Sequence, residues 1–179
     1  MTNFRTILMT FAAALCLAAA LTAAAQQPSK WKAYAPAGEV YSVSLPCTPA
    51  VEPDSVTTKD GVKITVKVAG CVAGTVYYMV STSDFSSLPN GAKVTLDTFR
   101  DGVVTGSGTE LGPETSVSLG EAPGRAFTST GSIDGVEVHY TWRVYLVGSR
   151  IYTLAAANTA ATTPATDADT FISSFKLKK

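Results

Sequence analysis

The chain has 179 residues, 46% of them hydrophobic, and carries 14 basic and 14 acidic residues, so its formal net charge is zero. This length is typical of a single domain with its own hydrophobic core. A neutral chain with scattered charges has no electrostatic attraction to nucleic acid or to an anionic lipid surface, so we expect neither as a partner.

Residues 1–25 have the pattern of a secretory signal peptide. A single arginine precedes an apolar run over residues 7–20, and Ala23 and Ala25 have the spacing of a cleavage site. No basic stop follows the run, so a permanent membrane span is a poorer interpretation. We therefore predict a single domain over residues 26–179, exported to the periplasm or the extracellular medium, with no stable membrane span after cleavage.

The cysteine count agrees with export. Cys16 would be removed with the signal peptide, which leaves Cys47 and Cys71. An even pair in an oxidising compartment predicts a disulfide. A redox or metal-binding pair is the alternative, but Cys-x-x-Cys spacing is absent, and Pro46 and Pro49 flank Cys47 as in a rigid structural turn.

Alternating apolar and polar residues predict strands in the first half of the chain. The predicted strands cover residues 41–45, 62–68 and 75–82, and the segment 51–58 is predicted to be a loop. Between residues 88 and 106 the period changes to that of an amphipathic helix, which should end near Gly106.

Strand patterns return in the second half of the chain. The predicted strands cover residues 115–119, 125–130, 136–146 and 150–156. Asp134-Gly135 is typical of a type I′ hairpin turn before the third of them. In that strand we predict Trp142 on the buried face and His139 on the opposite face. A second helix should begin at Thr163-Pro164 and bury Phe171, Ile172 and Phe175.

Antiparallel hairpins combined with two amphipathic helices indicate an α+β fold, because an apolar helix face needs a sheet to cover. Three stretches carry a family resemblance: residues 31–34 with 39–46, residues 122–127, and residues 150–154 with 171–177. In these stretches the chain resembles exported bacterial proteins of the PsbP-like superfamily. The resemblance implies an antiparallel β-sheet flanked by two amphipathic helices, an α/β/α sandwich, and an accessory or binding role. It carries over no site residue.

The sequence offers little for catalysis. His139 is the only histidine, and a Gly-x-Ser-x-Gly nucleophile motif is absent. One histidine excludes the multi-histidine zinc and iron sites, and dinucleotide and phosphate-loop motifs are missing, so we predict no metal, no cofactor and no enzyme. A paired-carboxylate glycosidase remains an open alternative, because such carboxylates meet only in space.

A candidate interface lies on the polar face of the strand 136–146. His139, Arg143 and Tyr145 recur there with a period of two, and Arg125 and Arg150 are expected on neighbouring strands. Arginine and aromatic side chains are enriched at protein interfaces. The alternative is that a helix covers this face, because the pattern does not say which face is open.

These observations predict an exported, non-enzymatic binding or accessory protein of the bacterial cell envelope, whose partner is another envelope protein. The alternative is a carrier of a small apolar or lipid ligand in a cavity between sheet and helix. A carrier needs an empty interior, whereas a close-packed core would fill that space. A hydrolase with an unusual site is a third, weaker hypothesis.

Overall fold

The computed structural model describes residues 31–57, 61–89, 94–159 and 165–178. Of these residues 60% lie in strands and 14% in helices, so the protein is mostly β. The predicted signal peptide and the predicted helix start at Thr163-Pro164 lie outside the described residues.

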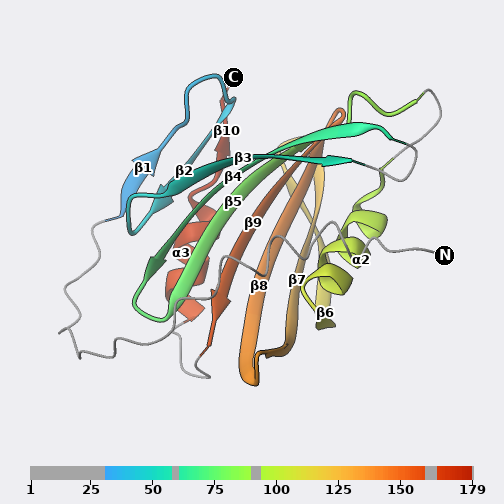
Figure 1. Cartoon of the computed structure of the whole chain (residues 1–179). Coiled ribbons are helices and arrows are strands. Elements are labelled where there is room, and N and C mark those ends of the chain that lie inside the picture. Colours follow the sequence, from blue (N-terminus) through green and yellow to red (C-terminus); the bar gives the residue numbers. More distant parts are fainter. Residues whose placement is uncertain (1–30, 58–60, 90–93, 160–164, 179) are drawn as a thin grey trace.

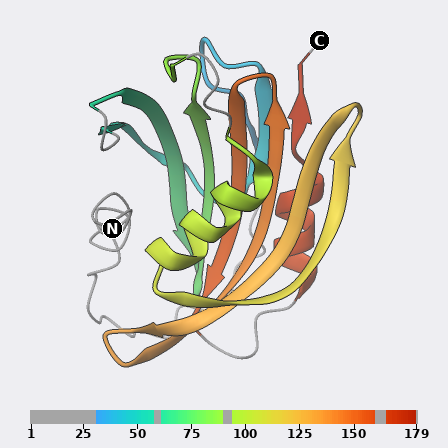
Figure 2. The ribbon, with the colours of Figure 1, turned by 90° about the vertical axis from the view of Figure 1, so that its right-hand side faces the viewer.

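A seven-stranded antiparallel sheet, the main sheet, forms the centre of the fold (Figure 1). Its strands are β3 (Ala50–Thr57), β4 (Lys63–Ala73), β5 (Val76–Asp84), β6 (Thr109–Leu119), β7 (Ala122–Ile133), β8 (Val136–Val147) and β9 (Arg150–Asn158). Their spatial order is β3-β4-β5-β9-β8-β7-β6, and Figure 2 shows that the sheet is strongly curved. Only β5 and β9 are neighbours in the sheet without being consecutive strands of the chain.

A second sheet covers part of one face of the main sheet. Its strands are β1 (Lys32–Tyr34), β2 (Tyr41–Leu45) and β10 (Lys176–Leu177), in the order β1-β2-β10. The alternation predicted for residues 41–45 is confirmed, because Tyr41, Val43 and Leu45 are all buried in one apolar cluster with residues of the main sheet.

Two short helices, α2 (Leu96–Gly106) and α3 (Ala165–Ser173), lie on opposite faces of the main sheet (Figure 2). Thr95 caps α2, because its hydroxyl accepts a hydrogen bond from the backbone N–H of Thr98 at 3.1 Å. The predicted end of this helix near Gly106 is confirmed. Neither described helix is long and apolar enough to cross a membrane.

The predicted α/β/α sandwich is wrong, because one face of the main sheet is shared between α3 and the second sheet. The α3 helix has nine residues and is about 13.5 Å long. Seven strands spaced about 4.8 Å apart are roughly twice as wide. The apolar row of β2 and the residues around it therefore cover a further part of this face, and the fold is mostly β rather than α+β.

The loop predicted over residues 51–58 is also wrong, because residues 50–57 form the edge strand β3. Pro53 pairs with Lys67 of β4 without ending the strand. Proline lacks a backbone N–H and cannot donate a hydrogen bond to a neighbouring strand. An edge strand tolerates this, because one of its two sides has no neighbouring strand.

The predicted register of β8 is confirmed. Trp142 is buried in the cluster beneath α2, together with Phe127, Val144 and Ile151. The turn before β8 has positive φ at both Asp134 and Gly135, as a type I′ turn requires. One face of β8 therefore packs under α2, and the face that carries His139 points the other way.

Candidate functional site

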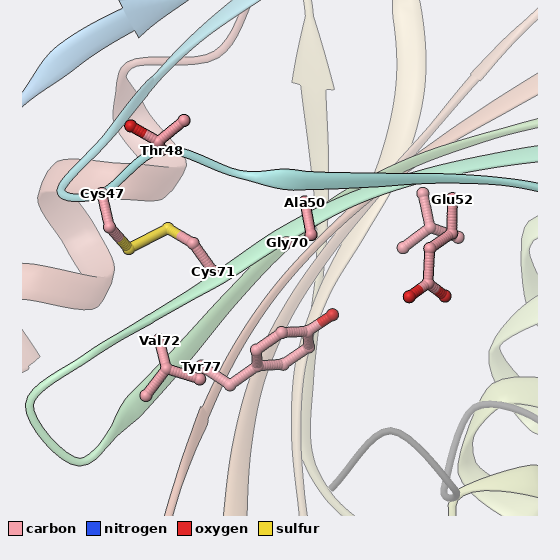
Figure 3. Close-up of a pocket in the computed structure, with 9 residues that line it drawn as sticks. Cys47, Thr48, Ala50, Glu52, Gly70, Cys71, Val72 and Tyr77 are labelled. Carbon is pink, nitrogen blue, oxygen red and sulfur yellow. A yellow bond between two sulfur atoms is a disulfide. The ribbon is translucent and has the colours of Figure 1, made fainter.

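A groove of about 350 Å³, the Tyr77 groove, opens on the main sheet beside the disulfide (Figure 3). Its walls come from the β2–β3 connection and from strands β3, β4 and β5. They comprise Cys47, Thr48, Ala50, Glu52, Val68, Gly70, Cys71, Val72 and Tyr77. The volume lies in the range of small-molecule sites.

Strand register brings the polar and apolar walls of the groove together. Glu52 pairs with Val68, and Val72 pairs with Tyr77. Directly paired residues of antiparallel strands point to the same face, and Gly70 lies on that face between Val68 and Val72. Two hairpins therefore fix the floor of the groove.

Tyr77 lies across β4 because Gly70 has no side chain. A Cβ atom at Gly70 would overlap with the phenol ring and hydroxyl of Tyr77. Burial raises the pKa of Tyr77, and the negative charge of Glu52 raises this pKa further. The phenol therefore stays protonated at neutral pH, with the Glu52 carboxylate close by (Figure 3).

A disulfide between Cys47 and Cys71 closes one end of the groove, as the cysteine pair predicted. The bond joins the β2–β3 connection to β4 and spans 24 positions of sequence. It therefore holds the second sheet against the main sheet at the point where the groove begins.

The groove combines polar and apolar side chains. Glu52 supplies an exposed carboxylate, Tyr77 supplies a hydroxyl, and Val72 is an apolar side chain that is 65% exposed. A nucleophile with a base in hydrogen-bond reach is not among the wall residues.

The structure does not bring the five predicted interface residues together. Arg125 points to the α2 face, where it forms ion pairs with Asp97 at 3.0 Å and Glu114 at 3.2 Å. Arg150 pairs with Asp84 at 2.9 Å.

The other three predicted interface residues lie on β8, on the face that carries α3. Tyr145 is buried and stacks on Phe175, with ring centres 5.9 Å apart. His139 and Arg143 remain partly exposed on this face.

His139 contacts one carboxylate in the described part of the chain, Glu137, with 3.1 Å between Nε2 and Oε1. Its side chain is 38% exposed. Within the described ranges, no group of three or more histidine, cysteine, aspartate or glutamate side chains could hold a metal ion.

Glu39 is a buried carboxylate that no sequence pattern predicted. Its side chain is 6% exposed, and its Oε1 accepts a hydrogen bond from Nζ of Lys67 at 2.6 Å. Burial raises the pKa of Tyr41, and the charges of Tyr34, Glu39 and Tyr152 add to the effect. No local pattern marks Glu39, because its partner lies 28 positions away in the sequence. This ion pair links the β1–β2 connection to β4.

No protein-family model matches the chain, and no curated protein matches it. Among solved structures, a Pseudomonas aeruginosa protein of unknown function, described as a putative regulator, is 8% identical with a TM-score of 0.41. The match covers 77% of this chain and 89% of that chain. A Bacteroides thetaiotaomicron structure is 12% identical with a TM-score of 0.43, over 78% of this chain and 46% of that chain. Neither likeness assigns a function.

Proposed function

We propose that the protein is a non-enzymatic binding protein of the bacterial cell envelope, which acts after export and holds part of a partner protein in the Tyr77 groove. The observation that carries the proposal is Val72, which lines the groove and is 65% exposed. When a partner covers an exposed apolar side chain, the free energy falls by roughly 25 cal/mol for each Å² of apolar surface removed from water.

The disulfide supports the envelope location. Cys47 and Cys71 are bonded, and such bonds persist in oxidising compartments. The signal-peptide pattern of residues 1–25 points to the same compartment. We expect N-terminal sequencing of the exported protein by mass spectrometry to place its first residue at Gln26. Retention of Met1 would contradict export by this route.

The composition of the groove supports binding rather than catalysis. Glu52 and Tyr77 are its two ionisable side chains that do not take part in the disulfide. His139 lies on β8, on the face of the main sheet opposite to the groove. The groove therefore offers fixed polar contacts around an apolar wall, which is the usual composition of a recognition site.

The packing beneath α2 favours a binding protein over a carrier of an apolar ligand. Leu96, Val103 and Val104 of α2 share one buried cluster with Trp142 and Phe127 of the sheet. Side chains that touch in this way occupy the space that a ligand between sheet and helix would need.

Site-specific photo-crosslinking tests the proposal in the cells that produce the protein. A photoreactive residue replaces Val72, and the matched control carries it at Val136, which is 50% exposed on the β7–β8 hairpin. We expect a discrete adduct of one partner protein from position 72 and none of that mass from position 136. The same adduct from both positions, or none from position 72, would refute the groove as the binding surface.

The Glu52 carboxylate provides a second readout of the same contact. Glu52→Gln keeps the size of the side chain and removes its charge, so it should reduce the yield of the adduct from position 72. Glu110→Gln, an exposed glutamate on β6, serves as the control and should leave the yield unchanged.

A further inference from the structure

One part of the α3 face of the main sheet carries polar side chains in place of an apolar cover. The α3 helix packs against β2 and β9, and Tyr145 on β8 is the last aromatic side chain of the buried cluster in this direction. Beyond it, Thr128, Thr141 and Arg143 on β7 and β8 are partly exposed. This part of the sheet is therefore open to a ligand.

Strand register brings these three side chains together. Thr141 pairs directly with Thr128, and Arg143 pairs with Ala126 on one side and Leu154 on the other. Successive residues on one face of a strand lie about 7 Å apart, so the arginine can reach both threonines. Ala126 and Leu154 have no polar side-chain group, so neither can accept a hydrogen bond from the guanidinium through its side chain.

Arg143 differs from the other arginines of the described ranges. Arg100, Arg125 and Arg150 all form ion pairs with carboxylates. Arg143 forms none within those ranges, and its Nε is buried without an acceptor. A buried donor that lacks an acceptor destabilises the fold, so an anion that completes the hydrogen bonds of the guanidinium would stabilise this part of it.

The hydroxyls and charges around Arg143 define what such a ligand needs. The side-chain hydroxyls of Thr128 and Thr141 bond to no other side chain among the described residues, and each hydroxyl can both donate and accept. The two carboxylates of β6 and β8 on this face, Glu110 and Glu137, pair in register with Thr130 and Ser132, nearer the β7–β8 turn. The part of the face around Arg143 thus combines one cation with two hydroxyls.

We propose that Arg143, Thr128 and Thr141 form a binding site for an acidic sugar, which carries a carboxylate or a phosphate group beside free hydroxyls. The guanidinium donates paired hydrogen bonds to the anionic group, and the threonine hydroxyls bond with the hydroxyls of the sugar ring. The site goes beyond the proposed function, because it lies on the opposite face from the Tyr77 groove and takes a different ligand.

Titrations of the exported protein, followed by amide NMR spectra at constant ionic strength, test the proposal. The probes are glucuronic acid, a hexose phosphate, uncharged glucose and inorganic phosphate. We expect shifts that saturate at millimolar concentrations, centred on the amides of β7 and β8, for at least one of the two acidic sugars. The sugar that binds more tightly tells whether the carboxylate or the phosphate is the natural group.

Arg143→Gln should weaken binding by about tenfold or more, as expected for hydrogen bonds to a charged group. Arg143→Lys keeps the charge but lacks the planar fork, so it should recover only part of the affinity. Thr128→Val and Thr141→Val change the size of the side chain little. Each should weaken the binding of the acidic sugar more than the binding of inorganic phosphate. Arg125→Gln, on the opposite face, is the matched control and should bind like the wild type.

Three results would overturn the proposal. They are the absence of saturable binding by both acidic sugars, equal binding of glucose, and an unchanged affinity in Arg143→Gln. Inorganic phosphate that binds as tightly as the hexose phosphate would overturn the assignment to a sugar. The adduct from position 72 should be the same in Arg143→Gln, so failure of this site and failure of the groove can be told apart.

Discussion

Trp142 donates a hydrogen bond from its indole Nε1 to the hydroxyl of Ser129, 2.9 Å away on the neighbouring strand. Both side chains are buried, and the rings of Tyr140 and Phe127 stack on the indole at 5.0 and 5.9 Å. The largest aromatic side chain beneath α2 thus has its polar atom satisfied, as buried indoles require. The core under α2 depends on this pair in two separable ways, through packing and through the hydrogen bond.

Trp142→Ala should lower the free energy of unfolding by roughly 3–5 kcal/mol, because it leaves a large cavity in the core. His139→Ala, three residues earlier and on the opposite face, should change it by no more than about 0.5 kcal/mol. Urea unfolding of both variants checks the expectation. A larger loss in His139→Ala would mean that the two faces of β8 are exchanged.

The hydrogen bond itself can be isolated with Ser129. Ser129→Ala should cost roughly 1–3 kcal/mol, because the buried indole N–H then has no acceptor. In a Trp142→Phe background the same change should cost less, since the donor is already gone. A double-mutant cycle measures the difference, and fully additive losses would contradict a functional hydrogen bond between the two residues.

Removal of the disulfide should destabilise the protein by roughly 3–4 kcal/mol, on the loop-entropy estimate for a loop of this length. Cys47→Ala with Cys71→Ala makes the change without leaving a free thiol. Reductant should lower the midpoint of thermal unfolding in the wild type and leave the double variant unchanged. Two freely alkylated thiols in native wild-type protein would refute the bond.

Gly70→Ala should displace Tyr77, because the new methyl group occupies the space of the phenol. We expect a loss of stability of about 1–3 kcal/mol from overpacking, together with a weaker adduct from position 72. Adding Tyr77→Ala should make the alanine at position 70 harmless, because the space is then free. An equal cost of Gly70→Ala in both backgrounds would show that the two residues do not compete.

Asp84 should report on acid unfolding. Hydrogen bonds from Ser86, followed by the contact with Arg150, hold the pKa of Asp84 below its ordinary value of 3.8. A carboxyl with a lowered pKa in the folded state contributes stability that is present above pH 3.8 and is lost as the pH falls through the lowered pKa. NMR titration of the carboxyl carbons should show this, and Ser86→Ala should move the pKa upward. A wild-type pKa at or above 3.8 would contradict it.

The sequence located the strands whose two faces have different environments. Residues 41–45 and 136–146 alternate because one row of each strand is buried. The strand β3 was missed because it is an edge strand that contains Pro53, and such a strand has no strict need for alternation. The prediction of an α/β/α sandwich was wrong for a related reason. The pattern of residues within each element does not reveal that β2 and β10, which are far apart in the sequence, pair with each other.

The candidate sites depended on long-range contacts even more strongly. The alternation of polar and apolar residues placed His139 and Arg143 on one face of β8. It could not show which face Arg125 occupies, because Arg125 points toward α2 only through its pairing with Val144 on the neighbouring strand. Gly70 inside a strand was a usable signal for the Tyr77 groove, because such glycines often mark a close approach of another group. The Glu39–Lys67 pair left no signal, since neither residue is unusual in its own segment.

The pairing of β10 with β2 makes folding depend on chain segments that are far apart. Leu177 pairs with Tyr41, and the backbone N–H of Ser44 bonds to the hydroxyl of Ser174 across 130 positions. If the chain is exported with its N-terminus first, as we propose, β2 emerges long before its partner, with its apolar row uncovered. Folding through such distant contacts is slow. On this proposed route the protein should be most prone to aggregation and to capture by chaperones before β10 has emerged, and a chain cut before residue 174 should remain in that state.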